Sequence, residues 1–203
     1  MSAADARPWV VLPVKGFTRA KSRLAGSLPP SPRAQLARTL FERAVAAARE
    51  CPRVGGVLIA TDGNDVERIC TTLGLPTLRD ARGATLSAVI DAGLDHLLAR
   101  QVSRAIVLMA DLPEIMPRAI DEVARELEPG RLVLVPDAAR RGTNALGLTL
   151  GTEPPFRTCF GNPDSLQRHV RRAAEHGLEA RVLVQPRVAF DLDRPVDLAR
   201  ATR

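Results

Sequence analysis

The feature that most constrains the fold of this 203-residue chain is a repeated alternation of short apolar runs with longer helix-like segments. The apolar runs are residues 9–13, 55–62, 75–80, 103–113, 131–137, 145–150, 179–186 and 187–193. The helix-like segments are residues 28–50, 64–74, 85–100, 117–127, 162–177 and 194–201. Such alternation is typical of a mostly parallel sheet covered by helices on both faces. We therefore predict an α/β fold, organised as one domain over residues 1–203.

Local signals predict several helix boundaries. Ser31 suits the N-cap of the first helix, and Pro32 suits its first helical position. Gly74 and Gly177 follow helix-like segments, where a glycine can take the left-handed conformation that ends a helix.

Composition narrows the classes of partner. The net charge is +6, but aromatic residues make up only 3% of the chain. Single-stranded nucleic acid is bound on aromatic stacking platforms, so a basic nucleic-acid-binding module is an alternative and not the leading hypothesis. A basic patch for a small phosphorylated ligand fits better. The chain has no apolar run of about 18 residues and no signal-peptide order at its start, so we expect a cytoplasmic protein without membrane contact.

The three cysteines carry no metal-site pattern. Cys51, Cys70 and Cys159 lack the CxxC spacing, and no histidine stands beside them in the sequence. We expect them to be reduced thiols, as in most intracellular proteins.

In parallel α/β sheets, ligands bind outside the carboxyl ends of the strands. The loop after the first apolar run, in "PVKGFTRAKSRLAG", contains Lys15, Lys21 and Arg23 among glycines. Cationic side chains and exposed backbone N–H groups suit a polyphosphate. The GxxxxGK[ST] spacing of a Walker loop is missing. The alternative is an ordinary solvated basic loop.

Carboxylates follow other apolar runs. Asp111 comes directly after "AIVLMA", where a carboxylate needs water, a donor or a cation, and we favour magnesium over a helix-capping role. Asp191 and Asp193 alternate in "AFDLD", so in an extended segment they face the same side and could share a cation. Asp193 could instead cap the helix that begins near Pro195. Asp80 also follows a strand.

Neutral donors gather in two polar loops. Thr143 and Asn144 in "RRGTNAL", with Gly161 and Ser165 in "FGNPDS", could hold a phosphate or carboxylate. His169 follows Ser165 by four positions and so shares its helical face. A structural role for His169 competes with a role as general base.

At these residues the chain resembles a family. "PVKGFTRAKSRLAG", "ADLP", "GTNAL", "FG…S…RH" and "FDLDRPVDL" occur in the order found in the guanylyltransferases of deazaflavin coenzyme F-420 biosynthesis. The resemblance implies a three-layer, Rossmann-like nucleotidyltransferase fold related to the molybdopterin guanylyltransferases. It also implies transfer of GMP from GTP to 2-phospho-L-lactate, phosphoenolpyruvate or 3-phospho-D-glycerate. The product would pass to a downstream deazaflavin-transferring enzyme.

The resemblance also implies roles for particular residues. Lys15, Lys21 and Arg23 would face the nucleotide phosphates, and Asp111 would act in catalysis and hold magnesium with Asp191 and Asp193. Thr143, Gly161 and Ser165 would bind the phospho-acid, with Asn144 beside Thr143. Asp80 and Ser87 are placed on the nucleotide side.

Two departures from the family pattern affect these expectations. The family's "GLN" ahead of the central helix is "ATLSAV" here, so Ser87 takes the place of an asparagine near the nucleotide. The family loop FGxGS is "FGNPDS" here, one residue longer and with added polar groups at Asn162 and Asp164. A longer loop could accommodate the extra hydroxyl of 3-phosphoglycerate, which makes this acid our leading expectation. Another molybdopterin-type nucleotidyltransferase is the alternative, although its usual LxGGxGxR loop is missing.

Overall fold

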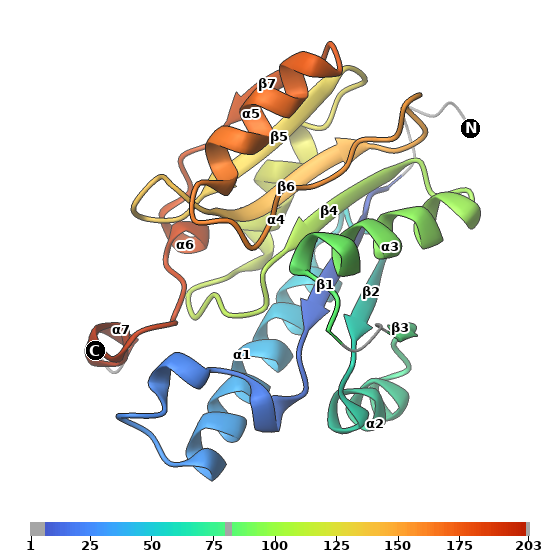
Figure 1. Cartoon of the computed structure of the whole chain (residues 1–203). Helices are drawn as coiled ribbons and strands as arrows, with labels where there is room; N and C mark the ends of the chain where they lie inside the picture. The colour runs from blue at the N-terminus through green and yellow to red at the C-terminus, as the bar shows by residue number, and fades with distance from the viewer. Residues whose placement is uncertain (1–6, 80–82, 202–203) are drawn as a thin grey trace.

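The computed structural model describes residues 7–79 and 83–201, in which seven strands form one sheet (Figure 1). The strands are β1 (Trp9–Val14), β2 (Gly56–Thr61), β3 (Thr77–Arg79), β4 (Arg104–Leu108), β5 (Arg131–Pro136), β6 (Thr143–Thr149) and β7 (Glu179–Val182). Their order across the sheet is β3-β2-β1-β4-β6-β5-β7. The α/β prediction is confirmed.

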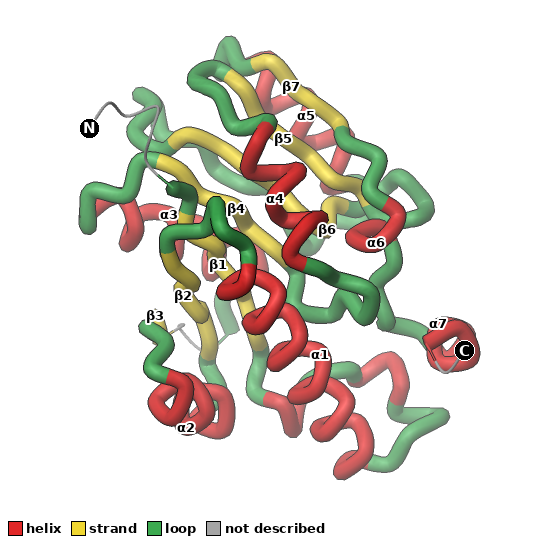
Figure 2. Tube along the Cα trace, turned by 180° about the vertical axis from the view of Figure 1, so that it is seen from behind, coloured by secondary structure: helices red, strands yellow, loops and turns green. Residues whose placement is uncertain are grey.

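Helices cover both faces of the sheet, as Figures 1 and 2 show from opposite sides. On one face lie α1 (Pro30–Glu50), α2 (Asn64–Leu73), α4 (Pro117–Arg125) and α6 (Pro186–Ala189). On the other lie α3 (Leu86–Ala99) and α5 (Ser165–Glu175). The alternation of side chains along β1 explains the three layers, because Val10 packs with Phe41 of α1 while Val11 packs with Ile90 of α3.

One strand runs against the others. β1 pairs in parallel with β2 and β4, β2 with β3, and β5 with β7. β6 lies between β4 and β5 and is antiparallel to both. The start of β6 therefore lies at the edge where β4 and β5 end, beside the loops that follow β1 and β2. This edge carries the candidate site.

Several predicted boundaries are confirmed and others are wrong. Gly74 caps α2 with a φ of 64°, and Gly177, one residue beyond the C-cap of α5, has a φ of 66°. The first helix begins earlier than predicted, at Pro30 with Pro29 as N-cap, so Ser31 lies inside it. The predicted strand over residues 187–193 is wrong, because α6 (Pro186–Ala189) takes its first part and residues 190–193 pair with no strand of the described chain.

The three cysteines are buried free thiols, as expected. Within residues 7–79 and 83–201, no helix is both long enough and apolar enough to cross a membrane. The last helix, α7 (Pro195–Ala201), lies apart from the sheet at the C-terminal end of the described chain (Figure 1).

Candidate active site

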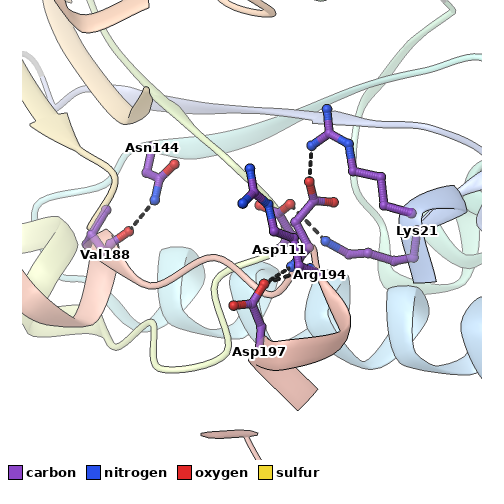
Figure 3. Close-up of polar contacts among 8 residues, drawn as sticks. Lys21, Asp111, Asn144, Val188, Arg194 and Asp197 are labelled. Carbon is purple, nitrogen blue, oxygen red and sulfur yellow. Dashed lines mark hydrogen bonds and ion pairs between the residues drawn. The ribbon is translucent and has the colours of Figure 1, made fainter. Parts of the chain in front are cut away.

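The loop after β1 turns back toward the sheet through two short 3-10 helices, η2 (Phe17–Arg19) and η3 (Ser22–Leu24). Lys21 joins them in the left-handed region, with a φ of 54°, a conformation that is unfavourable for a lysine. Its side chain is only 7% exposed, and its Nζ donates to Asp111 Oδ2 at 2.8 Å (Figure 3). The strained backbone thus aims a buried cation at the carboxylate that follows β4.

The segment after α6 is bonded to the backbone of the same residue, Asp111. The backbone N–H of Leu192 donates to the carbonyl oxygen of Asp111 at 3.0 Å. This bond places Asp191 and Asp193, the two neighbours of Leu192, beside Asp111. Asp193 also forms an ion pair with Arg23 of the β1 loop. The structure thereby brings together five predicted residues from three distant parts of the sequence.

Asp191 lies in an unfavourable place for a lone carboxylate. Its pKa is raised, chiefly because it is buried and then because the charges of Asp111 and Asp193 lie nearby. A hydrogen bond from the side chain of Asn144 opposes this shift. A cation bound beside Asp191 would relieve this unfavourable charge.

Several of the predicted cations line one cavity of about 370 Å³. Its walls include Lys15, Lys21, Arg23, Asp111 and Asp193. Lys15 is exposed, and within the described part of the chain it forms no ion pair, so its ammonium group is available to a ligand. A cavity lined by three cations and two carboxylates suits a magnesium–polyphosphate.

Carboxylates are suitable ligands for magnesium, but here they do not form a complete coordination shell made of protein side chains alone. In residues 7–79 and 83–201, no three acidic, histidine or cysteine side chains converge as a metal site would require. Asp111 is paired with Lys21, and Asp193 with Arg23. Magnesium is usually held by one or two carboxylates together with substrate phosphates and water. Asp111 and Asp191 could supply the protein's share.

A second cluster, which the sequence analysis did not assign to the site, supports the β1 loop from β2. Arg19 pairs with Asp62 at 2.6 Å, and Asp62 also accepts the N–H of Gly16 at 3.2 Å. Asp65 accepts the N–H of Phe17 at 2.9 Å. Arg19 and both carboxylates line a cavity of about 630 Å³ that is open at this edge. Asp62 directly follows β2, at the edge of the sheet where ligands bind, but the sequence alone did not join it to Arg19.

The predicted acid-binding residues also meet at the sheet edge. Thr143 begins β6 and Ser165 begins α5, and their hydroxyl oxygens lie 3.4 Å apart. Gly161, with a φ of 83°, turns the loop that leads into α5. The same loop touches α3, since Ser87 Oγ donates to the carbonyl oxygen of Phe160 at 3.0 Å. Ser87 therefore stabilises the loop that contains Gly161. Its predicted contact with the nucleotide stays a prediction.

Asn144 is placed differently from a simple substrate ligand. It is buried, and its Nδ2 donates to the carbonyl oxygen of Val188 at 2.8 Å (Figure 3) and to that of Ala189 at 3.3 Å. These bonds hold α6 against β6 and so position the segment that carries Asp191. Asp80 lies outside the described residues.

Comparison with known proteins now decides the family. The sequence profile described as "Guanylyl transferase CofC like" matches residues 9–201. The chain belongs to this family. The resemblance in the sequence motifs is thereby confirmed, and the chain is a guanylyltransferase of the nucleotidyltransferase class.

Relatives of this guanylyltransferase cover nearly its whole length. It is 37% identical to a phosphoenolpyruvate guanylyltransferase of Rubrobacter xylanophilus over 95% of this chain and 92% of that protein. It is 34% identical to a phosphoenolpyruvate guanylyltransferase of Chloroflexus aggregans, covering 91% of each. A 3-phospho-D-glycerate guanylyltransferase of Phenylobacterium zucineum is 31% identical over 95% of this chain and 88% of that protein.

Solved structures confirm the fold. A Methanothermobacter nucleotidyl transferase superposes with a TM-score of 0.64 at 16% identity, covering 96% of this chain and 95% of that chain. A cytidylyltransferase of Leptospira borgpetersenii gives a TM-score of 0.61 at 12% identity over 95% and 84% of the two chains. The guanylyltransferase thus has the Rossmann-like nucleotidyltransferase fold.

Proposed function

We propose that this guanylyltransferase transfers GMP from GTP to a phosphorylated three-carbon acid, with phosphoenolpyruvate as the leading acceptor. The acid's phosphate oxygen attacks the α-phosphorus of GTP. The bond from that phosphorus to the bridging oxygen of the β-phosphate breaks, and pyrophosphate leaves. The product, a guanosine diphosphate joined to the acid, is an activated form suited to a downstream transfer in coenzyme F-420 biosynthesis.

The observation that carries the proposal is the meeting of Lys21 and Arg23 with Asp111 and Asp193 around one cavity. Lys15, Lys21 and Arg23 would neutralise the triphosphate and the departing pyrophosphate. Asp111 and Asp191 would hold magnesium, which when bound would supply further positive charge at the phosphates. No protein nucleophile is needed, because positioning and charge neutralisation account for this kind of catalysis.

The loop after Cys159 bears on the choice of acid. The sequence pattern favours 3-phosphoglycerate, because Asn162 and Asp164 could bind its hydroxyl. Asn162 Nδ2 donates instead to the carbonyl oxygen of Cys159 at 2.9 Å, and Asp164 pairs with Arg168 at 2.7 Å. Both polar groups are thus engaged locally. Together with the names of the relatives described above, this supports phosphoenolpyruvate, and the Phenylobacterium relative keeps 3-phosphoglycerate as second candidate.

The test is pyrophosphate release from GTP and magnesium with each of the three acids in turn, with the products identified by mass spectrometry. ATP and CTP serve as matched nucleotide controls. We expect release that depends on both GTP and an acid, and fastest with phosphoenolpyruvate. Release without an acid, or a preference for ATP or CTP, would contradict the proposal. A faster reaction with 3-phosphoglycerate or 2-phospholactate would change only the acceptor.

A further inference from the structure

His169 is the most deeply buried histidine of the described chain, and both of its ring nitrogens have partners. Its residue is 0% exposed, and its ring packs edge-on against Phe160 with centroids 4.9 Å apart. The backbone N–H of Cys159 donates to Nε2 at 2.7 Å. Thr143 Oγ1 lies 3.0 Å from Nδ1.

These contacts determine the tautomer. A backbone N–H can only donate, so Nε2 must accept and cannot carry a proton. Burial and the positive charge of Arg172 lower the pKa of His169 to about 4, so the ring is neutral at pH 7. The single proton of the neutral ring is therefore on Nδ1, and Nδ1–H donates to Thr143 Oγ1.

The tautomer decides how many hydrogens the hydroxyl pair of Thr143 and Ser165 can offer to a ligand. The pair has two hydroxyl hydrogens, and one is used between the two oxygens, 3.4 Å apart. Because Nδ1 of His169 donates to Thr143 and does not accept from it, the second hydrogen stays available to an acceptor outside the pair. With the opposite tautomer, Ser165 would donate to Thr143 and Thr143 to His169, and no hydroxyl hydrogen would remain.

We propose that His169 is a positioning residue that makes the Thr143–Ser165 hydroxyl pair a donor to an anion. The pair is suited to such a ligand, since Thr143 is 5% and Ser165 3% exposed, and a buried hydroxyl hydrogen needs an acceptor. Ser165 is also the first residue of α5, whose N-terminal end favours negative charge. The inference rests on the proposed function, in which the anion is the phosphate of the acceptor acid.

Two substitutions separate the two nitrogens of His169. The amide nitrogen of His169→Asn can replace Nδ1–H toward Thr143, but leaves the N–H of Cys159 without an acceptor. The amide oxygen of His169→Gln can accept from Cys159, but removes the donor to Thr143. We expect His169→Gln to raise the KM for the acid roughly tenfold to a hundredfold, with the KM for GTP unaltered. We expect His169→Asn to keep the acid KM near that of the wild type and to lower the melting temperature instead.

His176→Gln is the matched control, because it changes a histidine at the other end of α5 that contacts Phe156 and the carbonyl of Arg172. It should leave both KM values as they are. An equal acid KM in His169→Gln and His176→Gln, in an enzyme that is active with the acid, would overturn the inference and leave the guanylyltransferase function standing.

The tautomer can also be measured on the wild-type protein, so this test does not depend on whether a variant folds. Nitrogen-15 NMR of the histidine rings at pH 7 should show His169 protonated at Nδ1 only, and a proton on Nε2 would overturn the inference. Inorganic phosphate should raise the melting temperature of the wild type more than that of His169→Gln, and equal shifts would count against the donor role. If none of the three acids reacts with GTP, the proposed function fails, while these two measurements still decide the tautomer and the anion.

Discussion

Replacing Lys21 with methionine tests the central arrangement of the site, because the ammonium group of Lys21 competes with a metal ion for the Asp111 carboxylate. Methionine keeps most of the length and apolar volume of the buried lysine stem. It removes the ammonium group that is 2.8 Å from Asp111 Oδ2. We expect Lys21→Met to bind magnesium more tightly than the wild type in the absence of GTP, and to lose turnover because its contact with the phosphates is gone.

The size of the effect follows from the geometry. Two unit charges 2.8 Å apart attract by about 6 kcal/mol at an effective dielectric constant of about 20. Desolvation of Lys21, whose side chain is 7% exposed, offsets much of this. A charge-assisted hydrogen bond contributes about 1.5–3 kcal/mol net. Since about 1.4 kcal/mol is a factor of ten, freeing Asp111 should raise the affinity for magnesium roughly tenfold to a hundredfold.

Isothermal titration of magnesium chloride into the nucleotide-free protein measures this affinity directly. Lys15→Met is the matched control, because Lys15 lines the same cavity but forms no ion pair in the described residues. It removes the same charge without freeing a carboxylate. If Lys21→Met bound magnesium no more tightly than Lys15→Met, Asp111 would not be the site of competition and the argument would be refuted.

Three further predictions follow from the same geometry. Asp111→Asn should lower kcat/KM by at least about a thousandfold without changing the circular dichroism spectrum, and near-normal kinetics would rule out its proposed role. In Gly63→Ala, the added Cβ would overlap Gly16 Cα and lie 2.6 Å from Asp65 Oδ1. Urea titration should therefore show that the free energy of unfolding falls by about 1–3 kcal/mol, and steady-state kinetics should show a raised KM for GTP. If neither the free energy of unfolding nor the KM for GTP changed, the close contact between Gly63 and Gly16 would not constrain the two loops. The pKa of His169 is lowered to about 4 in the folded protein, so as the pH falls the unfolded chain takes up the extra proton before the folded chain does. The stability contributed by the neutral ring is therefore complete above about pH 6.5 and is lost by about pH 4. Denaturant unfolding should show that the free energy of unfolding falls by about 2–3 kcal/mol between about pH 6.5 and about pH 4. This pH-dependent fall should be absent in His169→Gln.

The sequence predicts the strands β1, β2, β4 and β5 well because each is a short, strongly apolar run. The loop after β1 could be placed at the ligand edge on that basis alone. The direction of β6 could not, since "TNALGLT" has the same buried character in either direction. Only its long-range pairing with β4 and β5 determines that it is antiparallel.

The segment after α6 shows the same limit. "AFDLD" alternates apolar and polar residues as a half-buried strand does, and Phe190 and Leu192 are indeed buried, at 5% and 1% exposed. The alternation correctly predicts which side chains point inward. It cannot say whether a partner strand is present, and here the segment is held at Leu192 by a backbone bond to Asp111 and is not itself a strand. The shared placement of Asp191 and Asp193 thus comes from a tertiary contact.

The reversed strand β6 also explains why the nucleotide and acid sides of the site adjoin. The N–H of Met109, just past β4, donates to the carbonyl oxygen of Asn144 at 2.9 Å. Asp111 follows Met109 by two residues, and Thr143 precedes Asn144 by one. One backbone bond therefore holds the proposed metal ligand, Asp111, near Thr143, whose hydroxyl is proposed to donate a hydrogen bond to the acceptor's phosphate. A parallel β6 would have brought its other end, at Thr149, to this edge. At the proposed site, the antiparallel direction would therefore bring the acceptor's phosphate next to the triphosphate, which is the proximity that an in-line transfer between them requires.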